Sequence, residues 1–270
     1  MNYRHAYHAG NFADCMKHAL LIALIQALQQ KPKPLAIIDT HAGTGHYDLS
    51  GVEAQKTGEW QAGIGRLRLA RPAALGPYID LIERLGLYPG SPAIAAALLR
   101  PQDRLIACEL HPVDAATLRR AVNGPPNIAI HARDGYTALN AFLPPPERRA
   151  LILIDPPFEH GDEFTRLTAC LTAAHDKFPS GVFAAWYPIK HRAPPRLFID
   201  TLRASRLRDV ITCELCLRPP VNPDTLNGCG LLIVNPPHQF TQTAAPIMAA
   251  LAQILADPTG TTAITREIDE

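Results

Sequence analysis

The sequence has no hydrophobic run long enough to cross a membrane. Its longest apolar stretch, "ALLIALIQAL", is about half of the roughly 20 residues that a membrane-spanning helix needs. The amino terminus, "MNYRHAYHAGN", also lacks the apolar region of a secretory signal peptide. These absences predict a cytoplasmic protein that has no membrane partner.

A large excess of charge is absent too. The 26 Lys and Arg residues nearly balance the 25 Asp and Glu residues, so the formal net charge is only +1. Proteins that bind nucleic acid through bulk electrostatics have a larger basic excess. Any contact with RNA or DNA is therefore expected at local patches, and the candidates are "NYRHAYH", "RLRLARP" and "KHRAPPR". For any one patch, a solvated surface of mixed charge is the simpler explanation.

Cysteine is too sparse for a disulfide framework, because the chain has six scattered cysteines. Cys213 and Cys216 form a C-x-x-C pair, but the pair lies in an expected strand, "DVITCELCLRP". Positions three apart on a strand face opposite sides of the sheet. A zinc site would also need two more ligands, and no second pair supplies them. We therefore expect buried thiols and no metal.

The chain has the length and pattern of a single α/β domain, residues 1–270. Apolar residues after Asn11 recur at helical spacing, and "PLAIID" then predicts a strand that ends at Asp39. About sixty residues precede the next strand, "DRLIACEL", where a simple crossover needs about a dozen. Residues 50–100 are thus expected to form an inserted helical subdomain of two or three helices, with Ser91 as a helix N-cap.

Strand and helix patterns then alternate, which indicates a doubly wound parallel sheet. Two final strand patterns, "RDVITCELCLRP" and "GCGLLIVN", have only a loop between them and predict an antiparallel hairpin, which a closing helix follows. Only the tail after Asp257 is expected to be disordered. This order resembles the class I methyltransferase (Rossmann-like) fold, in which the last strand runs antiparallel to the others.

Acidic residues follow three successive strands. The turn "DTHAGTG" after the first strand begins with Asp39 and has two glycines, but Asp48 replaces the third glycine of a dinucleotide-binding loop. This disfavours a nicotinamide dehydrogenase, and the turn resembles the S-adenosylmethionine loop of class I methyltransferases. Glu109 and Asp134 end the next two strands, where such acids contact the ribose and the adenine of a cofactor. Each acid alone has a simpler interpretation as a helix cap.

The fourth strand ends in Asp155-Pro156-Pro157-Phe158, which matches the Asp-Pro-Pro-aromatic signature of amino-methyltransferases. The lone pair of an amine on an aromatic base is delocalised. Two preorganised acceptors, the Asp155 carboxylate and the Pro156 carbonyl, can orient its N–H groups, and Phe158 can stack on the base. A near-copy, "VNPPH", ends a strand that we expect to be antiparallel. Asn235 is therefore expected at the opposite edge of the sheet.

The motifs "YRHAYHAGNFADCMKH", "DTHAGTGHYDL", "YPGSP", "CELHP", "RDGY" and "IDPPFE" together resemble the bacterial ribosomal RNA large subunit methyltransferase J family. The resemblance implies transfer of a methyl group from S-adenosylmethionine to N6 of one adenine of 23S rRNA, adenine 2030 in the family. It implies catalysis at Asp155 and an RNA contact at Tyr3. Lys17, beside His18, is a separate candidate for a contact with the RNA substrate or a phosphate. The implied cofactor contacts are His18, His41, Ser91, Glu109, Asp134 and Gly135.

Two alternatives remain open from the sequence. A DNA adenine-N6 methyltransferase would use the same four-residue signature, although the chain shows no obvious target-recognition domain. A non-catalytic RNA- or nucleotide-binding protein could keep the fold without the reaction. The chain is expected to act as a monomer.

Overall fold

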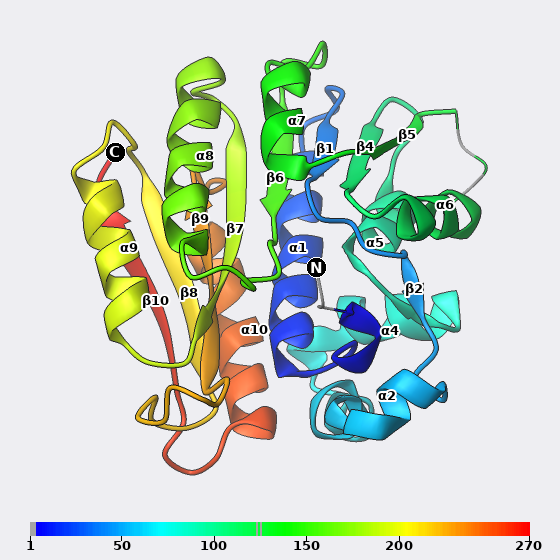
Figure 1. Cartoon of the computed structure of the whole chain (residues 1–270), viewed down its shortest axis with the longest axis vertical. Helices are drawn as coiled ribbons and strands as arrows, with labels where there is room; N and C mark the ends of the chain where they lie inside the picture. Colours follow the sequence, from blue (N-terminus) through cyan, green and yellow to red (C-terminus); the bar gives the residue numbers. More distant parts are fainter. Residues whose placement is uncertain (1–3, 123, 125) are drawn as a thin grey trace.

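The architecture is built on one eight-stranded sheet with helices on both faces (Figure 1). The computed structural model describes residues 4–122, 124 and 126–270. The strands of the sheet lie in the order β10-β8-β9-β7-β6-β1-β4-β5. Their bounds are β1 Ala36–Asp39, β4 Arg104–Glu109, β5 Ile128–Ala132, β6 Ala150–Ile154, β7 Val182–Ile189, β8 Val210–Cys216, β9 Gly228–Val234 and β10 Thr261–Ile268.

Strand direction agrees with the doubly wound prediction. Strands β5, β4, β1, β6 and β7 are parallel neighbours, and β9 runs antiparallel to both β7 and β8. The carboxyl ends of the five parallel strands therefore meet at one edge, while β9 ends at the other. The predicted antiparallel hairpin of β8 and β9 is confirmed.

The prediction for the carboxyl-terminal tail was wrong. Residues Thr261–Ile268 form β10, which pairs antiparallel with β8 as the outer strand of the sheet. Side chains reinforce this pairing, because Thr212 on β8 donates a hydrogen bond to Glu267 at 2.8 Å. The polar, threonine-rich sequence of the tail had suggested disorder, but an outer strand needs few buried side chains and gains its hydrogen bonds from the neighbouring backbone.

Two apolar layers enclose the sheet. One layer contains α1, α5 and α10, and the other contains α7, α8 and α9. Successive strand residues alternate between the layers: Ile37 packs in the first and Ile38 in the second. Cys213 and Cys216 likewise lie in different layers, as their spacing predicted. The helix bounds are α1 Phe12–Gln29, α5 Ser91–Leu98, α6 Pro112–Ala121, α7 Gly135–Phe142, α8 Glu163–Lys177, α9 Ala193–Arg203 and α10 Phe240–Leu255.

Residues 50–100 contain more elements than the two or three helices expected. They form α2 (Val52–Thr57), a π-helical turn η2 (Gln61–Gly65), α3 (Arg66–Ala70), α4 (Gly76–Leu85) and α5. A short strand, β3 (Tyr88–Pro89), pairs with β2 (His46–Tyr47), a pairing too short for alternation to reveal. Ser91 is the first residue of α5 and Gly90 its N-cap, so the predicted cap was wrong by one position.

Helix α1 begins where Asn11 caps it, because the Asn11 side-chain oxygen accepts hydrogen bonds from the backbone N–H groups of Ala13 and Asp14. The helix is buried over most of its length and packs against α10 and α5. In Figure 1 its amino-terminal end lies near the carboxyl edge of the parallel strands. Among the described residues, no helix is both long and apolar enough to span a membrane.

Candidate active site

Four acidic side chains come together at the carboxyl edge of the parallel strands. Asp39 ends β1, Glu109 ends β4, Asp134 follows β5 and Asp155 follows β6. Because β5, β4, β1 and β6 are consecutive neighbours in the sheet, these four ends form one continuous row. The chain passes from β1 to β4 and β5 on one side of β1 and then returns to β6 on the other side. Such a switch point is where doubly wound sheets bind ligands.

The glycine turn after β1 is fixed by hydrogen bonds to Glu109. The Gly43 N–H donates to one Glu109 oxygen at 2.8 Å, and the His111 N–H donates to the other at 2.8 Å. Gly43 has a φ of +63°, and a Cβ there would lie 2.3 Å from the Tyr47 hydroxyl. The turn therefore requires glycine for both backbone and packing reasons. Burial raises the pKa of Glu109, and the two N–H donors offset part of that rise.

Asp39 carries an unsatisfied buried oxygen. Its carboxylate is almost fully buried, Oδ1 accepts only a long 3.3 Å bond from the His41 N–H, and Oδ2 has no partner among the described residues. Burial raises the pKa of Asp39 to about 7, and the Ser91 side chain opposes part of the rise. Buried polar atoms are normally paired, so this oxygen indicates a group that a ligand completes. The sequence placed Asp39 in the turn motif, yet our predicted site residues omitted it.

Asp134 and Gly135 begin α7 beside the same turn. Asp134 caps the helix, since its Oδ1 accepts a hydrogen bond from the Thr137 N–H at 2.8 Å. The role of helix cap, which was the simpler interpretation of Asp134 from the sequence, is therefore confirmed. A Cβ on Gly135 would lie 1.9 Å from the Thr40 carbonyl oxygen. Only glycine allows α7 to approach the β1 turn this closely.

The predicted histidines lie on opposite sides of β1. His41 follows the strand, with Nδ1 2.8 Å from the Thr40 hydroxyl oxygen, and its ring packs edge-on against Tyr136. His18 is buried in α1, and its Nδ1 lies 3.1 Å from the Tyr88 hydroxyl oxygen. Burial lowers the pKa of His41 to about 4 and that of His18 to about 3, so both rings are neutral at physiological pH.

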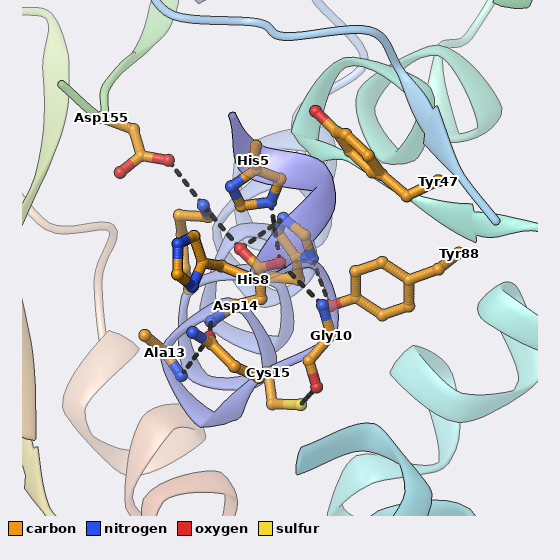
Figure 2. Close-up of polar contacts among 12 residues, drawn as sticks. His5, His8, Gly10, Ala13, Asp14, Cys15, Tyr47, Tyr88 and Asp155 are labelled. Carbon is orange, nitrogen blue, oxygen red and sulfur yellow. Dashed lines mark hydrogen bonds and ion pairs between the residues drawn. The ribbon is translucent and has the colours of Figure 1, made fainter. Parts of the chain in front are cut away.

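A buried ion network joins α1 to the Asp155 loop (Figure 2). The Lys17 ammonium donates to Asp155 Oδ2 at 2.5 Å and to Asp14 Oδ1 at 2.9 Å. Asp14 Oδ2 also accepts from the Gly10 N–H at 3.0 Å and lies 2.9 Å from His5 Nε2. Lys17 was predicted as an RNA contact, but its ammonium is buried between two carboxylates. The i,i+3 spacing of Asp14 and Lys17 on the predicted helix is visible in the sequence, but nothing there identifies Asp155 as a partner, because it is 138 positions away.

In this network, burial and the attraction between opposite charges shift the pKa values of Asp14 and Lys17 in opposite directions. Burial alone would raise the pKa of Asp14, but the nearby His5 and Lys17 outweigh it and hold the pKa well below its usual value. For Lys17, burial would lower the pKa, but Asp14 and Asp155 outweigh burial and raise it well above the usual value. Lys17 and Asp14 are therefore both charged at neutral pH. Their mutual attraction compensates for the loss of water around each group.

Phe158 lies next to Asp155 in a restricted backbone conformation. Its φ is +49°, a left-handed value that is uncommon for an aromatic residue. The ring contacts Phe164 and Trp186 edge-on, with centroids 4.9 and 5.8 Å away. These contacts fix the orientation of Phe158, while Pro156 and Pro157 stiffen the turn before it.

The second Pro-Pro motif lies at the other edge of the sheet. Asn235 follows the antiparallel strand β9, and its side-chain amide donates to the carbonyls of Pro179 and Gly181, both at 2.8 Å. The predicted position of Asn235 is thus confirmed, and the side chain closes the loop before β7. Tyr3 lies outside the described residues. Within the described ranges no group of three or more His, Cys, Asp or Glu side chains is arranged to hold a metal ion.

The sheet order, the antiparallel β9 between β7 and β8, and the row of acids define a class I methyltransferase fold. A solved protein from Legionella pneumophila has the same fold with a TM-score of 0.88, at 34% identity over 96% of this chain and 98% of that one. A probable spermidine synthase from Corynebacterium glutamicum, 13% identical with a TM-score of 0.54 over 93% of this chain and 75% of its own, shares the fold alone.

The chain belongs to the family described as ribosomal RNA large subunit methyltransferase D, RlmJ, whose model matches residues 32–267. Two relatives are each 36% identical over 97% of this chain and 96% of their own length. Both are named ribosomal RNA large subunit methyltransferase J, one from Haemophilus influenzae and one from Escherichia coli. The family resemblance drawn from the sequence motifs is confirmed.

Proposed function

We propose that the protein methylates the N6 amino group of one adenine in 23S rRNA, the base equivalent to adenine 2030, with S-adenosylmethionine as the methyl donor. The observation that carries this proposal is the position of Asp155-Pro156-Pro157-Phe158. The motif ends β6 directly beside β1, whose glycine turn and unpaired Asp39 oxygen offer a cofactor site. The names of the two curated relatives support ribosomal RNA as the substrate class.

The residues at the strand ends suit this cofactor. The unpaired Asp39 Oδ2 can accept a hydrogen bond from an ammonium group, and Glu109 lies where the acid of a doubly wound sheet binds ribose hydroxyls. Once bound, the cofactor would supply an electrophilic methyl group on a positively charged sulfur. The proposed contacts are the residues implied by the resemblance, His18, His41, Ser91, Glu109, Asp134 and Gly135, to which we add Asp39.

The protein groups around the amine have separate tasks. The Asp155 carboxylate and the Pro156 carbonyl accept hydrogen bonds from the N–H groups and direct the nitrogen lone pair. Phe158 stacks on the extruded base, a contact worth about 1 to 3 kcal/mol. After transfer the nitrogen carries an extra proton, and Asp155 is the nearest base to accept it. We propose Tyr3 as an RNA contact, whereas Lys17 acts by holding Asp155 in place.

A methylation assay with defined substrates tests the proposal. Purified protein should transfer radiolabelled methyl groups from S-adenosylmethionine to a 23S rRNA fragment that contains the target adenine, and not to the same fragment with guanosine there. Transfer to duplex DNA at a comparable rate would favour the DNA enzyme. Failure to bind S-adenosylmethionine in a calorimetric titration would favour a non-catalytic binding protein.

We further propose that residues 50–100 act as an inserted helical subdomain within one domain, residues 1–270, and that the protein acts as a monomer. Contacts with the segment before α1 support the first point. The Ile64 N–H donates to the Gly10 carbonyl at 2.9 Å, and the Asn11 side chain donates to Glu59 at 3.0 Å. The inserted residues therefore contact and stabilise the start of α1, the helix that carries Lys17.

A further inference from the structure

The loop after β7 concentrates positive charge that no carboxylate neutralises. Lys190, Arg192 and Arg196 are all exposed, and the sequence between residues 188 and 199 contains no Asp or Glu. None of the three forms an ion pair with a described residue. Arginines elsewhere, such as Arg104 and Arg203, are paired with carboxylates. These three residues lie within seven consecutive positions, at the end of β7 and the start of α9, and are here called the cationic loop.

The cationic loop lies at the same edge of the sheet as Asp155, the edge that the carboxyl ends of the parallel strands form. It lies farther along the strand direction than Asp155. Strand β7 pairs with β6 up to Ala185, opposite Ile154, and continues to Ile189. Those four extra residues extend β7 by about 13 Å at ~3.3 Å per residue. In Figure 1, β7 accordingly runs past the end of β6 before the chain turns into α9.

Aromatic contacts link the cationic loop to the methyltransferase motif. Phe158 packs against Phe164 at the start of α8, with ring centroids 4.9 Å apart. Phe164 packs in turn against Phe198 on α9 at 5.4 Å. Arg196 is on the same helix, two positions before Phe198. Helix α9, which carries Arg196, is therefore packed against the same aromatic cluster as Phe158.

The backbone of the cationic loop is held as well. Asn227 is buried, and its N–H donates to the Ile189 carbonyl at 3.1 Å. Its side-chain amide donates to the carbonyls of Lys190 and Asn222, at 2.8 and 2.7 Å. One side chain thereby joins the end of β7 to the loop between β8 and β9. A held backbone reduces the part of the ordering cost that would come from fixing the main chain at each binding event.

We propose that Lys190, Arg192 and Arg196 bind backbone phosphates of the substrate RNA a few nucleotides from the methylated base. The inference rests on the proposed function for the identity of the RNA. An offset of about 13 Å along the strand direction is compatible with phosphates within a few nucleotides of the base. Phosphate contacts of this kind fix the register of the nucleic acid, while the pocket at Asp155 reads the base. The three residues belong to "KHRAPPR", one of the patches that the sequence offered as candidate contacts with nucleic acid.

The test compares two triple variants. K190A/R192A/R196A removes the cationic loop, and K31A/K33A/R206A removes three exposed cations at the opposite edge, before β1 and β8. Fluorescence anisotropy measures the Kd of each protein for a labelled 23S rRNA fragment across a salt series. Calorimetry measures the affinity for S-adenosylmethionine, which also reports correct folding of the site.

We expect the loop variant to bind the RNA fragment at least about tenfold more weakly near 0.15 M salt. The slope of log Kd against log salt should fall by about 2 to 3, one unit for each lost phosphate contact. Its affinity for S-adenosylmethionine and its kcat at saturating RNA should stay within about twofold of the wild type, and the control variant should match the wild type throughout.

Two results would overturn the inference: an unchanged Kd and slope in the loop variant, or an equal loss in both triple variants. The proposed function is judged separately, by methyl incorporation in the wild-type protein. A wild type that binds the fragment through the cationic loop without methylating it would refute the proposed function and leave the binding surface standing.

Discussion

Lys17 on the first helix and Asp155 after the fourth parallel strand form a partly buried ion pair, with Nζ 2.5 Å from Oδ2. The pair joins the amino-terminal segment to the residue that we propose holds the substrate amine. Asp14 shares the same ammonium at 2.9 Å, and its other carboxylate oxygen lies 2.9 Å from His5 Nε2. The position of the Asp155 carboxylate therefore depends on a part of the chain that lies before the sheet begins.

The two Pro-Pro motifs provide a matched pair of variants. Asp155→Ala should reduce methyl transfer by at least about a thousandfold, because it removes the amine acceptor and the proton acceptor together. Asn235→Ala should leave turnover within about twofold, since that side chain only joins two carbonyls at the far edge. Single-turnover methylation and calorimetry with S-adenosylmethionine check both variants. Wild-type turnover by the Asp155 variant would remove this residue from the mechanism.

Replacing Lys17 should cost stability as well as activity. Lys17→Met leaves the buried Asp14 without its lysine partner, and the loss of one partner of a buried pair typically costs about 3 to 5 kcal/mol. The double variant Lys17→Met/Asp14→Asn should recover part of that loss, because it removes the unpaired charge. Urea denaturation measures the free energy of unfolding of the single and the double variant. Arg71→Met, which breaks an exposed pair with Glu83, serves as the control and should change little.

Cofactor binding should depend on pH through Asp39. Its pKa of about 7 means that the carboxyl must lose a proton before it can pair with an ammonium group. Affinity for S-adenosylmethionine should therefore rise with pH, by about tenfold between pH 6 and pH 8, and level off above the pKa. Asp39→Asn should bind weakly and show no such rise. An equally steep profile in that variant would assign the titration to another group.

The same pKa predicts a stability effect of known sign. The folded-state pKa of Asp39 lies above its unfolded value of 3.8, so the folded protein binds this proton more tightly. The neutral carboxyl is compatible with burial, whereas ionisation inside the protein is unfavourable. The contribution of Asp39 to stability is thus greatest below about pH 4 and declines as the pH rises towards 7. This contribution is measured as the difference in unfolding free energy between the wild type and Asp39→Asn, determined at pH 5 and at pH 8.

Glycine 135 should tolerate no side chain. Gly135→Ala places a methyl group 1.9 Å from the Thr40 carbonyl oxygen, so α7 or the β1 turn must move. We expect a loss of about 1 to 3 kcal/mol in unfolding free energy and weaker cofactor binding. Gly76→Ala, at the start of α4 with no atom within 4 Å of the added Cβ, is the matched control and should be neutral or slightly stabilising. Thermal unfolding distinguishes the two.

Periodicity and turn residues were enough to predict most of the sheet. The strands that end at Asp39, Glu109 and Ile154 are short apolar runs bounded by glycine or proline, and such local signals do not depend on tertiary context. The reversal of β9 followed from the absence of a helix in the loop before it. The acids of the site were visible for the same reason, since each one directly follows a strand.

Long-range pairing was not visible in the sequence. The tail that forms β10 has no apolar alternation, because its stability comes from backbone hydrogen bonds to β8. The contact between Lys17 and Asp155 depends on how α1 packs against the sheet, which no local pattern records. Lys17 was consequently assigned to RNA, the usual partner of a lysine beside such a site. Asp39 was recognised as part of a turn, but only the three-dimensional structure reveals its unpaired oxygen.

Strand β10 has a consequence for biosynthesis. It follows every other strand of the sheet in the sequence, and it covers the edge of β8 along seven paired positions. A ribosome releases the chain from its amino end, so every other strand has left the exit tunnel before β10 has. Until β10 emerges, the hydrogen-bonding edge of β8 is therefore exposed to other nascent chains. The edge is protected only after the residues of β10 have themselves left the tunnel.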